Sequence, residues 1–151
     1  MDKLQFLKNE FPKLLRTIDP NAKGAWGVLN GQQMVEHMAE SISFATGKSK
    51  QALHTPAEQV EKFKAFALSD KEFRPNTKNV LMSDVPAPTR KANMEEAVNA
   101  VEQELADFET YFNNNKGATL MNSIFGELNF QEWTILLHKH AVHHLKQFGK
   151  L

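Results

Sequence analysis

Apolar residues recur at steps of three and four positions in four separate stretches of the chain, a period typical of helices that bury one side. These stretches predict main helices over residues 2–16, 31–46, 94–111 and 129–148, and a shorter stretch predicts a minor helix over residues 56–68. No stretch has the strict alternation of a strand. Each main helix has one apolar side, so the economical arrangement is an all-α, four-helix bundle.

Two of the predicted helices begin with a reciprocal capping signal. Asn30 is followed three residues later by Gln33, and Asn129 is followed three residues later by Glu132. In each pair the first side chain accepts from the backbone of the third helical residue, and the second side chain reaches back. Pro12 lies inside the first helical pattern and has no backbone donor, so the sequence predicts either a kink there or a later helix start.

The second and third main helices are separated by a long connection. Residues 70–91 contain three prolines and few periodic apolar residues, which is typical of irregular structure. A link of this length can cross the bundle from end to end, so we expect a crossover connection between these helices. A chain of 151 residues has the usual size of one folded unit, and we expect a single domain over residues 1–151.

Composition removes several classes of protein. The 18 basic and 18 acidic residues give a net charge of zero, unlike a dedicated nucleic-acid or anionic-membrane binder. The chain has no cysteine, so any metal ion must be held by His, Asp or Glu. No apolar run is long enough for a membrane helix, and the acid and polar residues near the N-terminus are unlike a secretory signal. We therefore expect a cytoplasmic protein that binds neither nucleic acid nor membrane.

Four of the six histidines fall within residues 138–144. On a helix, His140 and His144 lie one turn apart on the side that faces the core, whereas His138 lies nearly opposite and His143 at the margin. His37 lies at the edge of the apolar side of the second helix. A third imidazole is therefore available to the inward pair.

Two imidazoles at positions i and i+4, with a third from a facing helix, form a set that binds one divalent ion and leaves a position open. An ion bound in this way lowers the pKa of a coordinated water or activates a thiolate. The alternatives are hydrogen-bonded core histidines without metal and a haem held by His and Met. The zinc-protease motif HExxH, the di-iron motif ExxH, the hydrolase motif GxSxG and the phosphate loop are all missing from the sequence.

Several blocks of the chain resemble the DinB-like (damage-inducible B) superfamily, specifically one of its uncharacterised subfamilies. The blocks are Trp26-Gly27, residues 33–38, residues 125–128 with Trp133, and residues 140–149, so the resemblance spans nearly the whole chain. The resemblance implies a four-helix bundle with a crossover link and a metal ion held by His37, His140 and His144. Characterised relatives include bacillithiol transferases and a mycothiol-dependent maleylpyruvate isomerase, in which a zinc-like ion activates a small thiol.

The residues and the resemblance together lead to one functional expectation. We expect a metal-dependent enzyme of the thiol-transferase or hydrolase type, with zinc or nickel, or alternatively iron or manganese, acting on a small-molecule substrate such as a thiol. The alternative is a non-catalytic metal-binding or structural bundle. We expect the loops with Trp26 and Phe125 to wall the pocket, and a homodimer contact through Ile135 and Val142, away from the inward side of the last helix.

Overall fold

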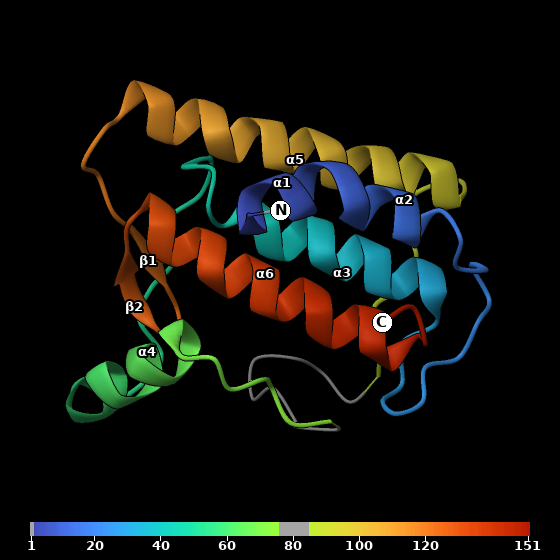
Figure 1. Ribbon diagram of the computed structural model, residues 1–151, viewed down its shortest axis with the longest axis horizontal. Coiled ribbons are helices and arrows are strands. Elements are labelled where there is room, and N and C mark those ends of the chain that lie inside the picture. The colour runs from blue at the N-terminus through green and yellow to red at the C-terminus, as the bar shows by residue number, and fades with distance from the viewer. Residues whose placement is uncertain (1, 76–84) are drawn as a thin grey trace.

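Most of the chain is helical in the computed structural model, which describes residues 2–75 and 85–151 (Figure 1). A π-helical turn, η1 (Phe6–Glu10), joins the first two short helices, and a 3-10 turn, η2 (Ala57–Gln59), precedes the fourth. The α-helices are α1 (Lys3–Gln5), α2 (Phe11–Leu15), α3 (Gly31–Ser43), α4 (Val60–Leu68), α5 (Met94–Asn114) and α6 (Phe130–Gln147), and the strands are β1 (Leu120–Asn122) and β2 (Gly126–Leu128).

Helices α3 and α6 begin at the capping pairs that the sequence predicts. Asn30 Oδ1 accepts from the Gln33 backbone at 2.8 Å, and Gln33 Oε1 accepts from the Asn30 backbone at 2.9 Å. Asn129 and Glu132 form the same pair of bonds at 2.9 and 3.0 Å. These caps satisfy N–H groups that would otherwise have no partner, so the prediction of both helix starts is confirmed.

The first helical segment starts at Lys3 and changes its hydrogen-bond register before Pro12. The Phe11 N–H donates to the Phe6 carbonyl, five residues back, in a wider π turn. Because Pro12 has no N–H to continue the ordinary pattern, the register changes at this point. The alternative of a later helix start is wrong.

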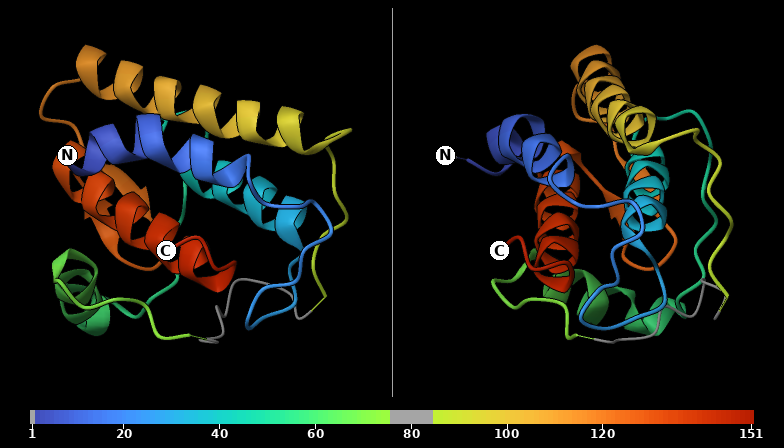
Figure 2. Two further views of the ribbon diagram at one scale, coloured as in Figure 1. Left: turned by 45° about the vertical axis from the view of Figure 1, so that its right-hand side comes forward. Right: turned by 90° about the vertical axis from the view of Figure 1, so that its right-hand side faces the viewer.

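Helices α3 and α5 lie side by side and run in the same direction (Figure 1). Gln32 at the start of α3 donates to the Lys91 carbonyl just before α5 at 2.9 Å, and Lys48 beyond the end of α3 pairs with Asp107 at 3.0 Å. The α1–α2 segment and α6 run in the opposite direction. Seen nearly along their axes, these four helical segments surround one interior (Figure 2).

The small sheet corrects the expectation of a chain without strands. β1 pairs antiparallel with β2 through three residues on each side, and Asn122 Oδ1 accepts from the backbones of Ile124 and Phe125 at 2.9 Å in the turn between them. Gly126 has a φ of +83°, which favours glycine. Strands of three residues are too short to show alternation in the sequence.

The connection after α3 contains the predicted minor helix, seen as η2 followed by α4, which packs on α6 and β2. Part of the predicted irregular link, residues 76–84, lies outside the described residues. On the far side of that part, the backbones of Arg90 and Lys91 donate to the buried carboxylate of Glu36, at 2.7 and 3.3 Å. Among the described helices, none has the length and apolar character needed to cross a membrane.

Candidate metal centre

Helices α3 and α6 bring His37, His140 and His144 together. Nε2 of His140 lies 3.1 Å from Nε2 of His37 and 2.9 Å from Nε2 of His144. The potential ligand atoms all lie within 4.8 Å of one another, so these three side chains could hold a metal ion. The structure thus brings together the three histidines that the sequence singles out.

The spacing of the three nitrogens suits a single small cation. In a tetrahedral zinc site with Zn–N bonds of about 2.0–2.1 Å, neighbouring nitrogens lie about 3.3 Å apart. The two short distances here, 2.9 and 3.1 Å, are within a few tenths of an ångström of that value. Small movements of the rings are enough to give ligand geometry.

Hydrogen bonding alone satisfies this cluster poorly. In a neutral imidazole each ring nitrogen carries either one hydrogen or one lone pair. Nε2 of His140 faces two other ring nitrogens at hydrogen-bond distance, and it cannot form two full hydrogen bonds with them. A cation bound by three lone pairs satisfies all three nitrogens at once, so the donor set fits a divalent metal better than it fits a core hydrogen-bond network.

Burial keeps the three imidazoles in the form that binds metal. Desolvation lowers the pKa of His37 to about 4 and that of His144 to about 3, and it lowers the pKa of His140 well below its ordinary value. Desolvation is the largest cause in each case, and the neighbouring histidines contribute a smaller part of the decrease, because each disfavours a positive charge on the next. All three rings are therefore neutral near pH 7, as metal ligation requires.

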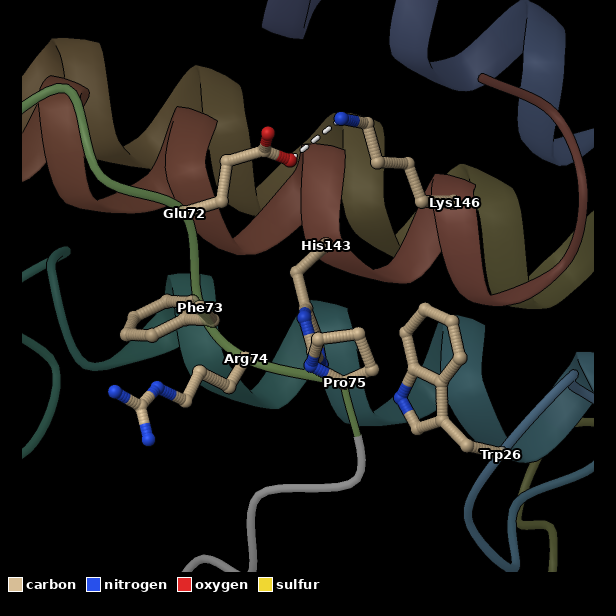
Figure 3. Close-up of a pocket in the computed structure, with 7 residues that line it drawn as sticks. All are labelled: Trp26, Glu72, Phe73, Arg74, Pro75, His143 and Lys146. Atoms are coloured by element: carbon tan, nitrogen blue, oxygen red, sulfur yellow. Dashed lines mark hydrogen bonds and ion pairs between the residues drawn. The ribbon is translucent and has the colours of Figure 1, made fainter.

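A pocket lies close to the cluster (Figure 3). None of the three cluster histidines lines it, but its lining residue His143 packs against His144, with ring centroids 5.1 Å apart. His144 is buried, whereas His37 and His140 keep part of their surface accessible. The Phe73 ring lies edge-on to His140, with centroids 6.3 Å apart. The pocket has a volume of about 370 Å³, and its lining residues are Trp26, Glu72, Phe73, Arg74, Pro75, His143 and Lys146.

His143 lies between the two aromatic walls of the pocket rather than in the cluster. Its ring centroid is 5.4 Å from Trp26 and 5.9 Å from Phe73. Trp26 therefore walls the pocket as the sequence predicts, but Phe125 instead packs behind Phe73, with centroids 6.4 Å apart. His138, expected at the surface, is partly buried with its ring edge against Phe6 at 5.2 Å.

The sequence does not reveal two residues that shape this site, Phe73 and Lys139. Lys139 is only 8% exposed, and its ammonium donates to the carbonyls of Ser69, at 2.9 Å, and Lys71. It also lies 5.0 Å from the centroid of the Phe66 ring. These contacts hold the segment that carries Phe73 against α6. The sequence gives no signal for the role of Lys139, because a lysine next to His140 on this helix is expected to be solvated.

Comparisons with known family models, with curated proteins and with solved structures found no match to this chain. The case for a metal centre therefore depends on the geometry of this chain. Membership of the DinB-like superfamily stays a prediction.

Proposed function

We propose that this protein is a metal-dependent enzyme whose divalent ion is held by His37, His140 and His144. The observation that carries the proposal is the convergence of three neutral imidazole nitrogens, with two residues of a nearby pocket, Phe73 and His143, packed against them. A convergent, partly accessible set of ligands next to a cavity is the usual arrangement of a catalytic metal site, whereas structural sites are closed.

We also propose that the fold belongs to the four-helix-bundle class with a crossover connection, as in the DinB-like superfamily. Support comes from the parallel course of α3 and α5, since two neighbouring parallel helices require a connection that returns along their length. In bundles of this class, metal ligands project inward from facing helices, as the three histidines of α3 and α6 do.

In this proposal the three histidines hold the ion, and the residues of the pocket place the substrate. Three imidazoles suit zinc or nickel, with iron as an alternative. Manganese prefers sites with more oxygen ligands. When bound, the divalent ion lowers the pKa of a coordinated water or thiol and so supplies a nucleophile near neutral pH. Trp26, Phe73 and His143 exclude water from one side and position a small-molecule substrate.

The proposed reaction class is a hydrolysis or a thiol transfer. The pocket of about 370 Å³ has the size of a site for a small molecule, and its walls combine aromatic rings with charged groups at the rim. Lys146 and Glu72 form an ion pair of 2.5 Å at this rim. A low-molecular-weight thiol is the substrate class we propose first, because the resemblance to thiol-dependent enzymes favours it.

Cobalt(II) substitution tests both the ligands and the accessible position. We expect the protein to take up one cobalt ion with the visible spectrum of a four- or five-coordinate nitrogen site. Addition of a small thiol such as 2-mercaptoethanol is expected to produce a sulfur-to-cobalt charge-transfer band, and the His144→Ala variant is expected to show neither spectrum. A cobalt spectrum that no thiol, anion or hydrolysable ester changes would indicate the non-catalytic metal-binding bundle instead.

A further inference from the structure

Gln147, in the last turn of α6, connects the metal centre to the loop that carries Trp26. Its side chain is 4% exposed. Oε1 lies 2.7 Å from Nδ1 of His144, and Nε2 lies 2.7 Å from the Trp26 carbonyl oxygen. One amide group therefore contacts a proposed metal ligand at one end and the backbone of the pocket wall at the other.

The Trp26 carbonyl determines which way the amide of Gln147 points. A carbonyl oxygen only accepts hydrogen bonds, so the NH₂ end of the amide must face it. The amide oxygen then faces His144, and because this oxygen also only accepts, Nδ1 of His144 must carry the hydrogen. A neutral imidazole has one ring hydrogen, so Nε2 of His144 keeps its lone pair. That lone pair is the one directed at His140.

The loop around Trp26 is shaped to fit Gln147. The Ala25 N–H donates to the Gln147 backbone carbonyl at 2.7 Å. A Cβ atom added to Gly24 would lie 2.7 Å from Gln147 Cγ, and one added to Gly27 would lie 2.8 Å from Gln147 Nε2. Both approaches are closer than real Cβ atoms show, and Gly27 also has a φ of +81°, so a larger residue at either position would displace Gln147 or the loop.

We propose that Gln147 is a positioning residue of the metal centre: it holds His144 in the tautomer whose Nε2 lone pair points at the ion, and it links that ring to the Trp26 loop. This inference rests on the proposed metal site, but its first part concerns the metal-free protein as well. Partners of this kind fix the ring orientation and raise the affinity of a ligand histidine, and their removal typically lowers metal affinity about 10- to 100-fold.

The tautomer is measured directly in metal-free protein labelled with ¹⁵N in histidine. Two-bond ¹H–¹⁵N correlation spectra at pH 7 distinguish a protonated ring nitrogen from one with a lone pair. We expect His144, assigned by its absence from the His144→Ala spectrum, to show a protonated Nδ1 and an unprotonated Nε2. A spectrum with the hydrogen on Nε2 overturns the inference, whatever the protein does with metal.

Substitutions at Gln147 separate positioning from packing. We expect Gln147→Leu to lower zinc affinity about 10- to 100-fold in competition with a chromophoric chelator, and to shift His144 toward the Nε2–H tautomer. Gln147→Glu keeps an acceptor for Nδ1–H but loses the donor to the Trp26 carbonyl, so the Nδ1–H tautomer is expected to persist and zinc affinity to fall less than in Gln147→Leu. Gln131→Leu, an exposed position on the same helix, serves as the matched control.

The outcomes distinguish this inference from the proposed function. Equal loss of affinity in Gln147→Leu and Gln147→Glu, with an unchanged tautomer, would show that Gln147 acts only by packing and would overturn the inference. A wild type with the Nδ1–H tautomer that binds no zinc would support the positioning by Gln147 and refute the proposed function. A wild type that binds zinc, but whose metal-free form carries the hydrogen on Nε2 of His144, would support the proposed function and refute the positioning by Gln147.

Discussion

The two halves of α6 bury the same side of one helix with different chemistry. The first half contributes Trp133, Leu136 and Leu137, which are at most 6% exposed and pack into the apolar core. The second half continues the helical spacing with His140 and His144, followed by Gln147. Apolar burial stabilises the fold, whereas burial of polar rings costs free energy unless every polar atom has a partner. The first half therefore stabilises the fold, and the second half supports a site.

The largest effect is expected from the apolar half. Trp133→Ala removes a side chain that is 1% exposed and whose Nε1 donates to the Leu120 carbonyl at 3.2 Å, so we expect the free energy of unfolding to fall by about 3–5 kcal/mol. Urea denaturation measures this loss. The other tryptophan provides the control, because Trp26 is partly exposed at the pocket and Trp26→Ala is expected to cost much less. Equal losses would remove the distinction between core and site.

A substitution in the polar half is expected to affect metal binding rather than folding. His140→Ala removes the nitrogen that lies within 3.1 Å of a ring nitrogen of both other histidines, and we expect at least about a 100-fold loss of zinc affinity with an unchanged circular dichroism spectrum. The matched control is His138→Ala, two residues away on the other side of α6. Undiminished zinc affinity in His140→Ala would contradict the proposed ligand set.

The polar half should also make the metal-free fold sensitive to acid. Because the folded pKa values, about 4 for His37 and about 3 for His144, lie below the ordinary 6.5, the unfolded chain binds more protons below pH 6.5. The contribution of these histidines to the free energy of unfolding is thus fully present above pH 6.5. It falls as the pH drops toward 4, by about 1.4 kcal/mol per pH unit for each such histidine.

Urea denaturation at several pH values, with a chelator present, measures this dependence. His37→Gln is expected to reduce the slope of the unfolding free energy against pH by the contribution of one histidine. His54→Gln, at an exposed position, is expected to leave this slope unchanged. A free energy of unfolding that stays constant between pH 7 and pH 5 would show that the three rings do not remain neutral in the fold.

The smallest effect is expected where α6 holds the pocket segment. Lys139→Met leaves the Ser69 and Lys71 carbonyls without their buried donor, and we expect a loss of roughly 1 kcal/mol in stability. Amide hydrogen exchange should rise in residues 69–73 and not in α3. Lys150→Met, near the end of the chain, is the control. Unchanged exchange in residues 69–73 would mean that Lys139 does not hold the segment.

Local signals were enough to predict the main helices and the three histidines that meet in the candidate metal centre. The starts of α3 and α6 depend on side chains three residues apart, and the facing of His140 and His144 depends only on helical spacing. His37 could be added because it lies at the edge of an apolar helix side. Signals of this kind involve residues that lie within one or two helical turns of each other, so they can be recognised in the sequence.

The rest depends on contacts between distant segments. Gln147 contacts a carbonyl 121 positions earlier, and Lys139 contacts a carbonyl 70 positions earlier, so neither role is visible along the chain. The sheet was missed for a related reason, because β1 and β2 are defined by their pairing and not by an alternating pattern. These contacts form only when the helices have packed.

Elemental analysis of protein purified without an affinity tag or chelator tests the central claim most directly. It should be made beside the His37→Ala and His144→Ala variants, with His138→Ala as the control. The account predicts near-stoichiometric zinc, nickel, iron or manganese in the wild type and in His138→Ala, and none in the other two variants. A wild type without metal, even after reconstitution with excess ions, would contradict the account and leave the three histidines as core residues.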